Sequence, residues 1–185
     1  MSFPGIPSLD AAVMAFIQTH FHNTVTDTVF PIITSLGEAG IGWIVLSLVL
    51  LCFKKTRRTG GLVLIAMTVT LLFGELTLKN IICRLRPCNV FTDFPMLIAR
   101  PTSYSFPSGH ALSSVISATV LTKTNRCFGY AAIPLAALIA FSRLYLYVHF
   151  PSDVLAAAVL GVVIGELVFR YGNRLLDRHK LLTVN

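Results

Sequence analysis

Long apolar runs separated by short polar segments dominate this chain. Two shorter apolar runs cover 36–53 and 106–122, and the second carries small hydroxyl residues of the kind found on helices packed inside a membrane bundle. Three other runs reach the length of about 20 residues that a helix needs to cross a bilayer: 60–83, 128–148 and 151–171. The pattern predicts an all-α, polytopic membrane helix bundle.

The N-terminal segment is less regular than the rest. Leu9–Phe21 is typical of an amphipathic helix lying in the membrane interface, and Thr24–Leu36 of a short span interrupted by Pro31. We therefore predict about six transmembrane helices plus an N-terminal interfacial helix, with five crossings as the alternative. No Lys or Arg precedes Lys54, so no cleavable signal peptide is expected.

Composition supports a membrane protein with a single domain. Of the 185 residues, 55% are hydrophobic and only 12% are charged, whereas about a quarter are charged in ordinary soluble domains. A water-exposed globular surface is excluded on this basis. The 4 Cys, 12 Gly and 9 Pro also fit neither a disulfide scaffold nor a collagen-like or disordered chain. We expect one integral-membrane domain over 1–185.

The net charge of +7 does not indicate a nucleic-acid-binding protein, because the basic residues form no stripe along a solvated face. They gather instead in short clusters beside the apolar runs: Lys54, Lys55, Arg57 and Arg58, then Lys123 and Arg126, then Arg170, Arg174, Arg178 and Lys180. Alternation of successive spans puts all three clusters on one face, which the positive-inside rule makes cytoplasmic. The polar loop 84–106 and the corner 142–153 then share the extracytoplasmic face.

Ionisable residues that membrane segments normally avoid gather at that extracytoplasmic face, where they indicate function. Arg suits forked contacts with phosphate oxygens and Lys supplies a point charge, so convergent cations predict an oxyanion ligand. Ser108 and Gly109 precede a helix whose free N–H groups attract anions. The candidate phosphate-binding residues are Lys79, Arg86, Ser108, Gly109 and Arg143.

Two histidines beside a phosphate divide naturally into a nucleophile and an acid–base group. Asp153 can accept a proton from one nitrogen of His149, which leaves the other nitrogen free to attack phosphorus. Because Pro151 is expected to end one helix and start another, this contact does not follow from the spacing alone. His110 remains for acid–base work.

Three motifs within 79–153 resemble the type 2 phosphatidic acid phosphatases, also called lipid phosphate phosphatases. The family pattern is K-x6-RP, PSGH and SR-x5-H-x3-D, and it reads here as KNIICRLRP from Lys79, PSGH from Pro107 and SRLYLYVHFPSD from Ser142. The resemblance implies a metal-independent, cofactor-free membrane phosphatase with six helices and an extracytoplasmic site. His149 would form a phosphohistidine, Asp153 would orient it, and His110 would protonate the leaving oxygen and activate water.

The substrate implied is a lipid phosphate or diphosphate in the bilayer, with undecaprenyl diphosphate as our first choice for so short a chain. Phosphatidylglycerophosphate and phosphatidate remain alternatives, and we expect a monomer or weak homodimer. Two other classes stay open. A non-catalytic lipid-phosphate transporter or binding protein would use the same anion pocket, and the vanadium haloperoxidases share this type of pocket but are soluble oxidoreductases.

Simpler structural roles are open for several of these residues. Lys79 could merely pair with Glu75 one helical turn earlier, and Ser108 and Asp153 could merely cap helices. Arg84 and Arg100 are interpreted as membrane-surface anchors. Further alternatives are a zinc site from His110, His149 and Asp153, a Cys83–Cys88 disulfide, and a Gly161–Gly165 motif for close packing within the bundle or for dimerisation.

Overall fold

The computed structural model describes residues 8–182 and is helical throughout its regular structure. The main helices, in chain order, are α1 (Ser8–His20), α2 (Thr24–Ser35), α3 (Ile41–Cys52), α4 (Arg57–Val69), α5 (Lys79–Ile82), α6 (Pro87–Val90), α7 (Gly109–Thr124), α8 (Arg126–Tyr145) and α9 (Pro151–Leu182). A 3₁₀ turn, Glu38–Gly40, joins α2 to α3, and a π-helix, Thr70–Leu78, joins α4 to α5. The all-α prediction is confirmed.

Polar residues and proline set where several helices begin. Asn23 caps α2, accepting hydrogen bonds from the backbone N–H groups of Val25 and Thr26. Asn125 ends α7 and accepts from the backbone of Cys127 to begin α8. Pro151 opens α9, where its missing N–H costs nothing. The break between α8 and α9 expected from Pro151 is therefore present.

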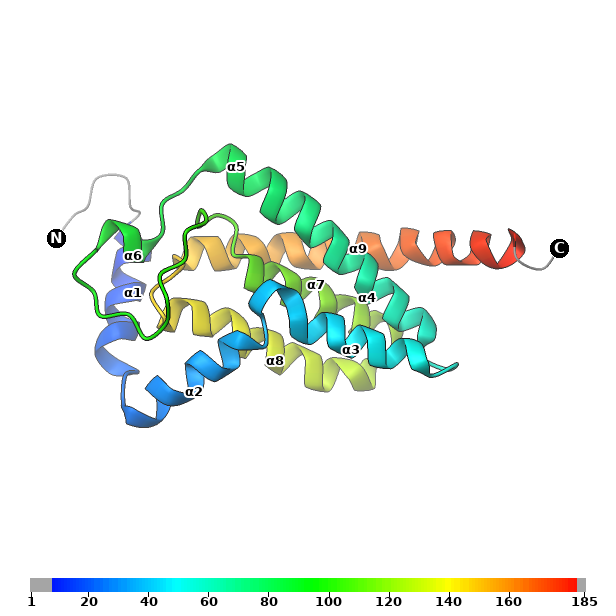
Figure 1. The fold of residues 1–185 in the computed structure, drawn as a ribbon, viewed down its shortest axis with the longest axis horizontal. Helices are drawn as coiled ribbons and strands as arrows, with labels where there is room; N and C mark the ends of the chain where they lie inside the picture. Colours follow the sequence, from blue (N-terminus) through cyan, green and yellow to red (C-terminus); the bar gives the residue numbers. More distant parts are fainter. Residues whose placement is uncertain (1–7, 183–185) are drawn as a thin grey trace.

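Fewer separate spans are found than the six we predicted. Among the described residues, three helices are long and apolar enough to cross a membrane: Arg57–Val90, Arg126–Tyr145 and Pro151–Asp177. Thr24–Ser35 and Glu38–Cys52 reach that length only together, as a pair bent by 44° (Figure 1). Two successive crossings would have to run in opposite directions, whereas α2 and α3 continue one another. The prediction of a separate crossing for 24–36 is wrong.

Helix α7 occupies the centre of the bundle. It packs against α4, α8 and α9, and most of its side chains are buried. A Cβ atom added to Gly161 or Gly165 of α9 would lie 2.7 Å from a side-chain atom of Val115 or Thr119 of α7. The two glycines therefore allow α9 to approach α7 closely, and of the two roles considered for this motif the structure shows packing within the bundle.

The two ends of the bundle differ in chemistry. At one end, Arg58 pairs with Asp177 at 2.8 Å and Lys123 pairs with Glu166 at 2.7 Å, so the basic clusters lie together as predicted. The side chains of Arg178 and Lys180 fall outside the described part. At the other end, α1 lies across the bundle, near α6, the loop 91–108 and the α8–α9 corner (Figure 1). The candidate site lies at this second end.

Candidate active site

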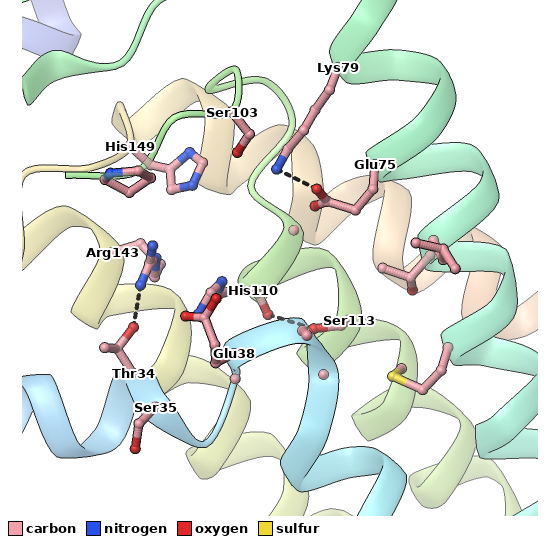
Figure 2. A pocket seen from close by; sticks show the side chains of 18 of the residues that line it. Thr34, Ser35, Glu38, Glu75, Lys79, Ser103, His110, Ser113, Arg143 and His149 are labelled. Carbon is pink, nitrogen blue, oxygen red and sulfur yellow. Dashed lines mark hydrogen bonds and ion pairs between the residues drawn. The ribbon is translucent and has the colours of Figure 1, made fainter. Parts of the chain in front are cut away.

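A cavity of about 1220 Å³ opens where the α2–α3 bend, the π-helix, the loop before α7 and the α8–α9 corner meet. Figure 2 shows side chains from these separate elements facing the same space. Six of the eight residues predicted for the site line this one cavity: Lys79, Arg86, Gly109, His110, Arg143 and His149. The other two, Ser108 and Asp153, are fully buried immediately behind its wall.

The three predicted phosphate-binding cations are all buried. Lys79, Arg86 and Arg143 are 5%, 3% and 3% exposed. Arg143 donates to the hydroxyl of Thr34 in α2, but its Nε–H is buried without a partner among the described residues. An unpaired buried donor costs free energy. A bound oxyanion would satisfy this donor and the positive charge at the same time.

Arg86 is the most firmly held of the cations. Its Nε and Nη2 donate to the carbonyl and hydroxyl oxygens of Ser103 at 2.6 and 2.9 Å. Its Nη1 donates to the carbonyl of Val148 at 2.9 Å and faces His149 Nε2, also at 2.9 Å. Because a guanidinium can only donate, His149 Nε2 must be the accepting, unprotonated nitrogen. The proton of this imidazole is therefore on Nδ1.

Ser105 connects His149 to Asp153. Its hydroxyl donates to Asp153 Oδ2 at 2.5 Å and lies 3.3 Å from His149 Nδ1, whereas Nδ1 and Oδ2 are 3.7 Å apart. The backbone N–H of Phe150 also donates to Oδ2, at 2.9 Å. The predicted proximity of His149 and Asp153 is present, with 3.7 Å between Nδ1 and Oδ2, but the shorter contacts run through Ser105, which sequence reasoning missed.

His149 lies between α8 and α9 and is only 1% exposed. Burial, followed by the nearby guanidinium groups of Arg86 and Arg143, holds the pKa of the His149 imidazole well below its usual range. The imidazole is therefore uncharged at neutral pH. An uncharged ring with Nε2 unprotonated is the state that a nitrogen nucleophile needs.

His110 lies in the first turn of α7, beneath the α2–α3 bend. Its Nε2 is 3.5 Å from a carboxylate oxygen of Glu38 and has no hydrogen-bond partner among the described residues. A Cβ on Gly37 would come within 2.8 Å of the imidazole, so the backbone of the bend packs directly on the ring. Ala39 and Gly40 turn the chain there with φ values of 47° and 70°. The bend thus brings an acidic side chain to His110.

Ser108 and Gly109 lie at the N-terminus of α7. Ser108 accepts a long hydrogen bond, 3.5 Å, from the backbone of Ala111, so the capping role considered for it is present. A Cβ on Gly109 would lie 2.0 Å from a carboxylate oxygen of Glu75, so a larger residue here would displace the Glu75 side chain. Glu75 also pairs with Lys79 at 2.7 Å. The Glu75–Lys79 ion pair considered above therefore exists, but it lines the cavity.

The two arginines interpreted as membrane-surface anchors bind protein groups. Arg84 pairs with Asp153 at 2.5 Å and with Asp10 of α1 at 2.8 Å, and Arg100 donates to the carbonyl of Cys88 at 2.5 Å. These guanidinium groups meet carboxylate or carbonyl oxygens of nearby segments, contacts that the anchor interpretation did not include. Asp10 and Glu38 were not predicted as site residues, although each is an isolated carboxylate in an apolar stretch, a pattern that indicates function.

The other structural alternatives find no support in the described residues. No group of three or more His, Cys, Asp or Glu side chains there is arranged to hold a metal ion, so the zinc alternative lacks its ligand set. Cys83 and Cys88 are both free thiols. The assembled groups suit a different chemistry, in which cations bind an oxyanion, a neutral imidazole attacks it and a second imidazole moves a proton.

Comparison with known proteins gives a consistent result. The PAP2 superfamily model matches residues 59–177. An undecaprenyl-diphosphatase of Sulfolobus acidocaldarius is 38% identical over 120 residues, which are 64% of this chain and 58% of that enzyme. The chain thus spans less than two thirds of that relative's length.

Two solved structures share the fold. Aquifex aeolicus LpxE superimposes with a TM-score of 0.78 and 25% identity, over 92% of this chain and all (100%) of that one. A transmembrane PAP2-type phosphatidylglycerolphosphate phosphatase from Bacillus subtilis gives 0.74 and 28% identity, over 93% of this chain and 88% of that one. The segment before residue 59, which supplies Asp10, Thr34 and Glu38, lies outside the family match.

Proposed function

Because this chain belongs to the PAP2 superfamily, we propose that it is a membrane lipid phosphatase that hydrolyses a lipid phosphate or diphosphate through a phosphohistidine on His149. One observation carries the proposal. The cavity gathers three buried cations around a neutral imidazole whose Nε2 is unprotonated. These are the parts that metal-independent phosphoryl transfer to nitrogen requires.

The first step forms a nitrogen–phosphorus bond. The Nε2 lone pair of His149 attacks phosphorus as the bond from phosphorus to the leaving oxygen breaks, and His110 gives that oxygen a proton. Charge on the equatorial oxygens in the loose transition state is stabilised by Lys79, Arg86 and Arg143. The ring of His149 becomes cationic, and Asp153 offsets that charge through Ser105.

The second step returns the enzyme to its starting state. His110 removes a proton from a water molecule, whose oxygen attacks the phosphohistidine. The nitrogen–phosphorus bond breaks, its electron pair returns to Nε2 of His149, and inorganic phosphate leaves. One water is consumed for each phosphoryl group released. Each imidazole therefore ends in the protonation state in which it began.

The shape and lining of the cavity suit an amphiphilic substrate. The cavity is polar where the predicted site residues line it. Between α3 and the continuous α4–π-helix segment its lining is apolar and includes Ile44, Leu64, Met67, Leu71 and Leu76. A headgroup on the cations would thus leave a hydrocarbon tail directed between these helices. We propose undecaprenyl diphosphate as the physiological substrate, supported by the Sulfolobus relative's activity, with phosphatidylglycerophosphate or phosphatidate as alternatives.

We further propose five membrane crossings with the site on the extracytoplasmic face. The bent α2–α3 pair and the three long candidate spans give four, and the central helix α7, of 16 residues, gives the fifth. The basic clusters at the opposite end favour a cytoplasmic location for that end. Helix α1 then lies in the outer interface. We expect a monomer or a weak homodimer.

The test is phosphate release by the full chain in detergent, from undecaprenyl diphosphate, phosphatidylglycerophosphate and phosphatidate, with EDTA present throughout. We expect release without added metal, fastest with undecaprenyl diphosphate. His149→Ala should abolish turnover, while the matched control His20→Ala, at an exposed site on α1, should retain it. Binding of the lipids without phosphate release would support a non-catalytic protein, and full activity of His149→Ala would remove it from the nucleophile role.

A further inference from the structure

Arg84 lies between two buried carboxylates. Its Nη1 is 2.5 Å from Asp153 Oδ1 and its Nη2 is 2.8 Å from Asp10 Oδ2. The side chains of Asp153 and Asp10 are 0% and 4% exposed, and that of Arg84 is 22% exposed. The guanidinium also lies over the ring of Phe150, 4.3 Å from its centroid. These contacts fix the position and the plane of the guanidinium.

Asp10 is held as firmly as Arg84. It accepts hydrogen bonds from the backbone N–H of Ser152 at 2.9 Å and from the Ser152 hydroxyl at 2.5 Å. Through these bonds the first turn of α1 is attached to the first turn of α9. The same serine hydroxyl accepts from Arg84 Nη1 at 2.7 Å. Asp10, Arg84 and Ser152 therefore form one closed network behind the α8–α9 corner.

This network contacts the carboxylate oxygen of Asp153 that is farther from His149. Arg84 binds Oδ1, whereas Ser105 and the backbone of Phe150 bind Oδ2, the oxygen nearer to His149. A fully buried carboxylate without a counter-charge would be costly to keep ionised. Arg84 supplies that counter-charge, and its fork also fixes which oxygen of Asp153 is turned toward the imidazole.

We propose that Arg84 and Asp10 are positioning residues of the His149–Asp153 pair. Arg84 supplies the counter-charge of Asp153 and fixes its orientation, and Asp10 keeps Arg84 in place. Helix α1, which precedes the residues 59–177 that the family model matches, is therefore part of the catalytic apparatus. The inference rests on the proposed phosphohistidine mechanism. A purely structural role of the network would affect folding but not the rate of phosphoryl transfer in folded protein, whereas the proposed positioning role affects that rate.

The experiment is chemical rescue of Arg84→Ala in the full chain. We expect kcat to fall about a hundredfold, as a misplaced catalytic group commonly costs, with KM and the inhibition constant for vanadate within about twofold of the parent. Guanidinium chloride at tens of millimolar should restore kcat at least tenfold, because the ion can refill the space over Phe150 between the two carboxylates. Quenched-flow measurement of phosphohistidine formation should show the same loss and the same recovery.

Arg58→Ala is the matched control, since Arg58 pairs with Asp177 and Asn173 at the opposite end of the bundle. It should keep parental kcat and show no response to guanidinium. Asp10→Asn is the second variant and is nearly isosteric. It should lower kcat about tenfold, and it should add little to the loss in Arg84→Ala because both act through Asp153.

The outcomes separate this inference from the proposed function. Arg84→Ala with kcat within threefold of the parent, or with a loss that guanidinium does not reverse, overturns the positioning role. Should Arg84→Ala fail to fold, an Asp10→Asn protein with parental kcat overturns it equally. Turnover that persists in His149→Ala would instead overturn the proposed mechanism, whatever Arg84 does.

Discussion

Replacing Ser105 by Ala tests how Asp153 supports His149 in the proposed mechanism. The hydroxyl of Ser105 is 2.5 Å from Asp153 Oδ2 and 3.3 Å from His149 Nδ1, whereas the direct distance between these two atoms is 3.7 Å. The 3.7 Å separation is too long for a good hydrogen bond. In the variant, the Nδ1–H of His149 would face Asp153 across a gap, while Phe150 N–H and Arg84 would still hold the carboxylate.

The size of the effect follows from the bond that is lost. A hydrogen bond to a charged group contributes about 1.5–3 kcal/mol, and about 1.4 kcal/mol corresponds to tenfold in rate. Because the link supports the cationic ring that forms as His149 attacks, we expect the loss to appear in kcat, by about 10- to 150-fold. KM should hardly change, since Ser105 does not line the cavity.

The assay is steady-state phosphate release, with the initial burst of phosphohistidine measured by rapid quench. Ser117→Ala is the matched control, because Ser117 is fully buried in α7 and its hydroxyl has no hydrogen-bond partner among the described residues. That control should keep parental kinetics. If Ser105→Ala kept kcat within about twofold of the parent, the contact at 3.7 Å would suffice and the bridging role of the serine would be refuted.

Two further predictions follow from the histidines. The lowered pKa of His149 disfavours its cation, so the ring should still be neutral at about pH 6, where a free imidazole is mostly protonated. Nitrogen NMR of histidine-labelled protein, with the His149 signal assigned from the His149→Asn variant, measures this. A charged His149 ring at that pH would contradict the prediction. Glu38→Gln should slow hydrolysis of a lipid phosphate about tenfold but leave the hydrolysis rate of p-nitrophenyl phosphate nearly unchanged, because only a poor leaving group needs the proton from His110. Equal losses of rate on both substrates would refute the link to leaving-group protonation.

The sequence was sufficient to predict which residues share the cavity. Lys79, Arg86, His110, Arg143 and His149 are separated by up to 70 positions, yet alternation of the spans placed all of them at one end of the bundle, where the structure has them. Their chemical roles remain predictions. Spacing was informative here because a membrane allows few directions for each helix, so the order of the segments nearly determines which ends meet.

The contacts of the loop and of the N-terminal segment could not be predicted in the same way. Ser105 precedes the PSGH motif in an irregular loop, whose path no periodicity specifies. The acidic partners of Arg84 were not predicted, because a basic residue at the end of a span is most often an anchor and the two partners lie 74 and 69 positions away. The bend between α2 and α3 depends on left-handed backbone at Ala39, a residue type that gives no such signal.

In the proposed mechanism, the same cations bind the substrate and keep the imidazole of His149 unprotonated. Lys79 is paired with Glu75, but within the described residues Arg86 and Arg143 form hydrogen bonds only to neutral groups. The site therefore retains positive charge for an incoming phosphate. That charge disfavours a proton on His149 before the substrate arrives. When Nε2 bonds to phosphorus, the phosphate oxygens neutralise the cations and Asp153 compensates the charged ring through Ser105. Binding of the anion therefore lowers the free energy of the intermediate in which the His149 ring is cationic.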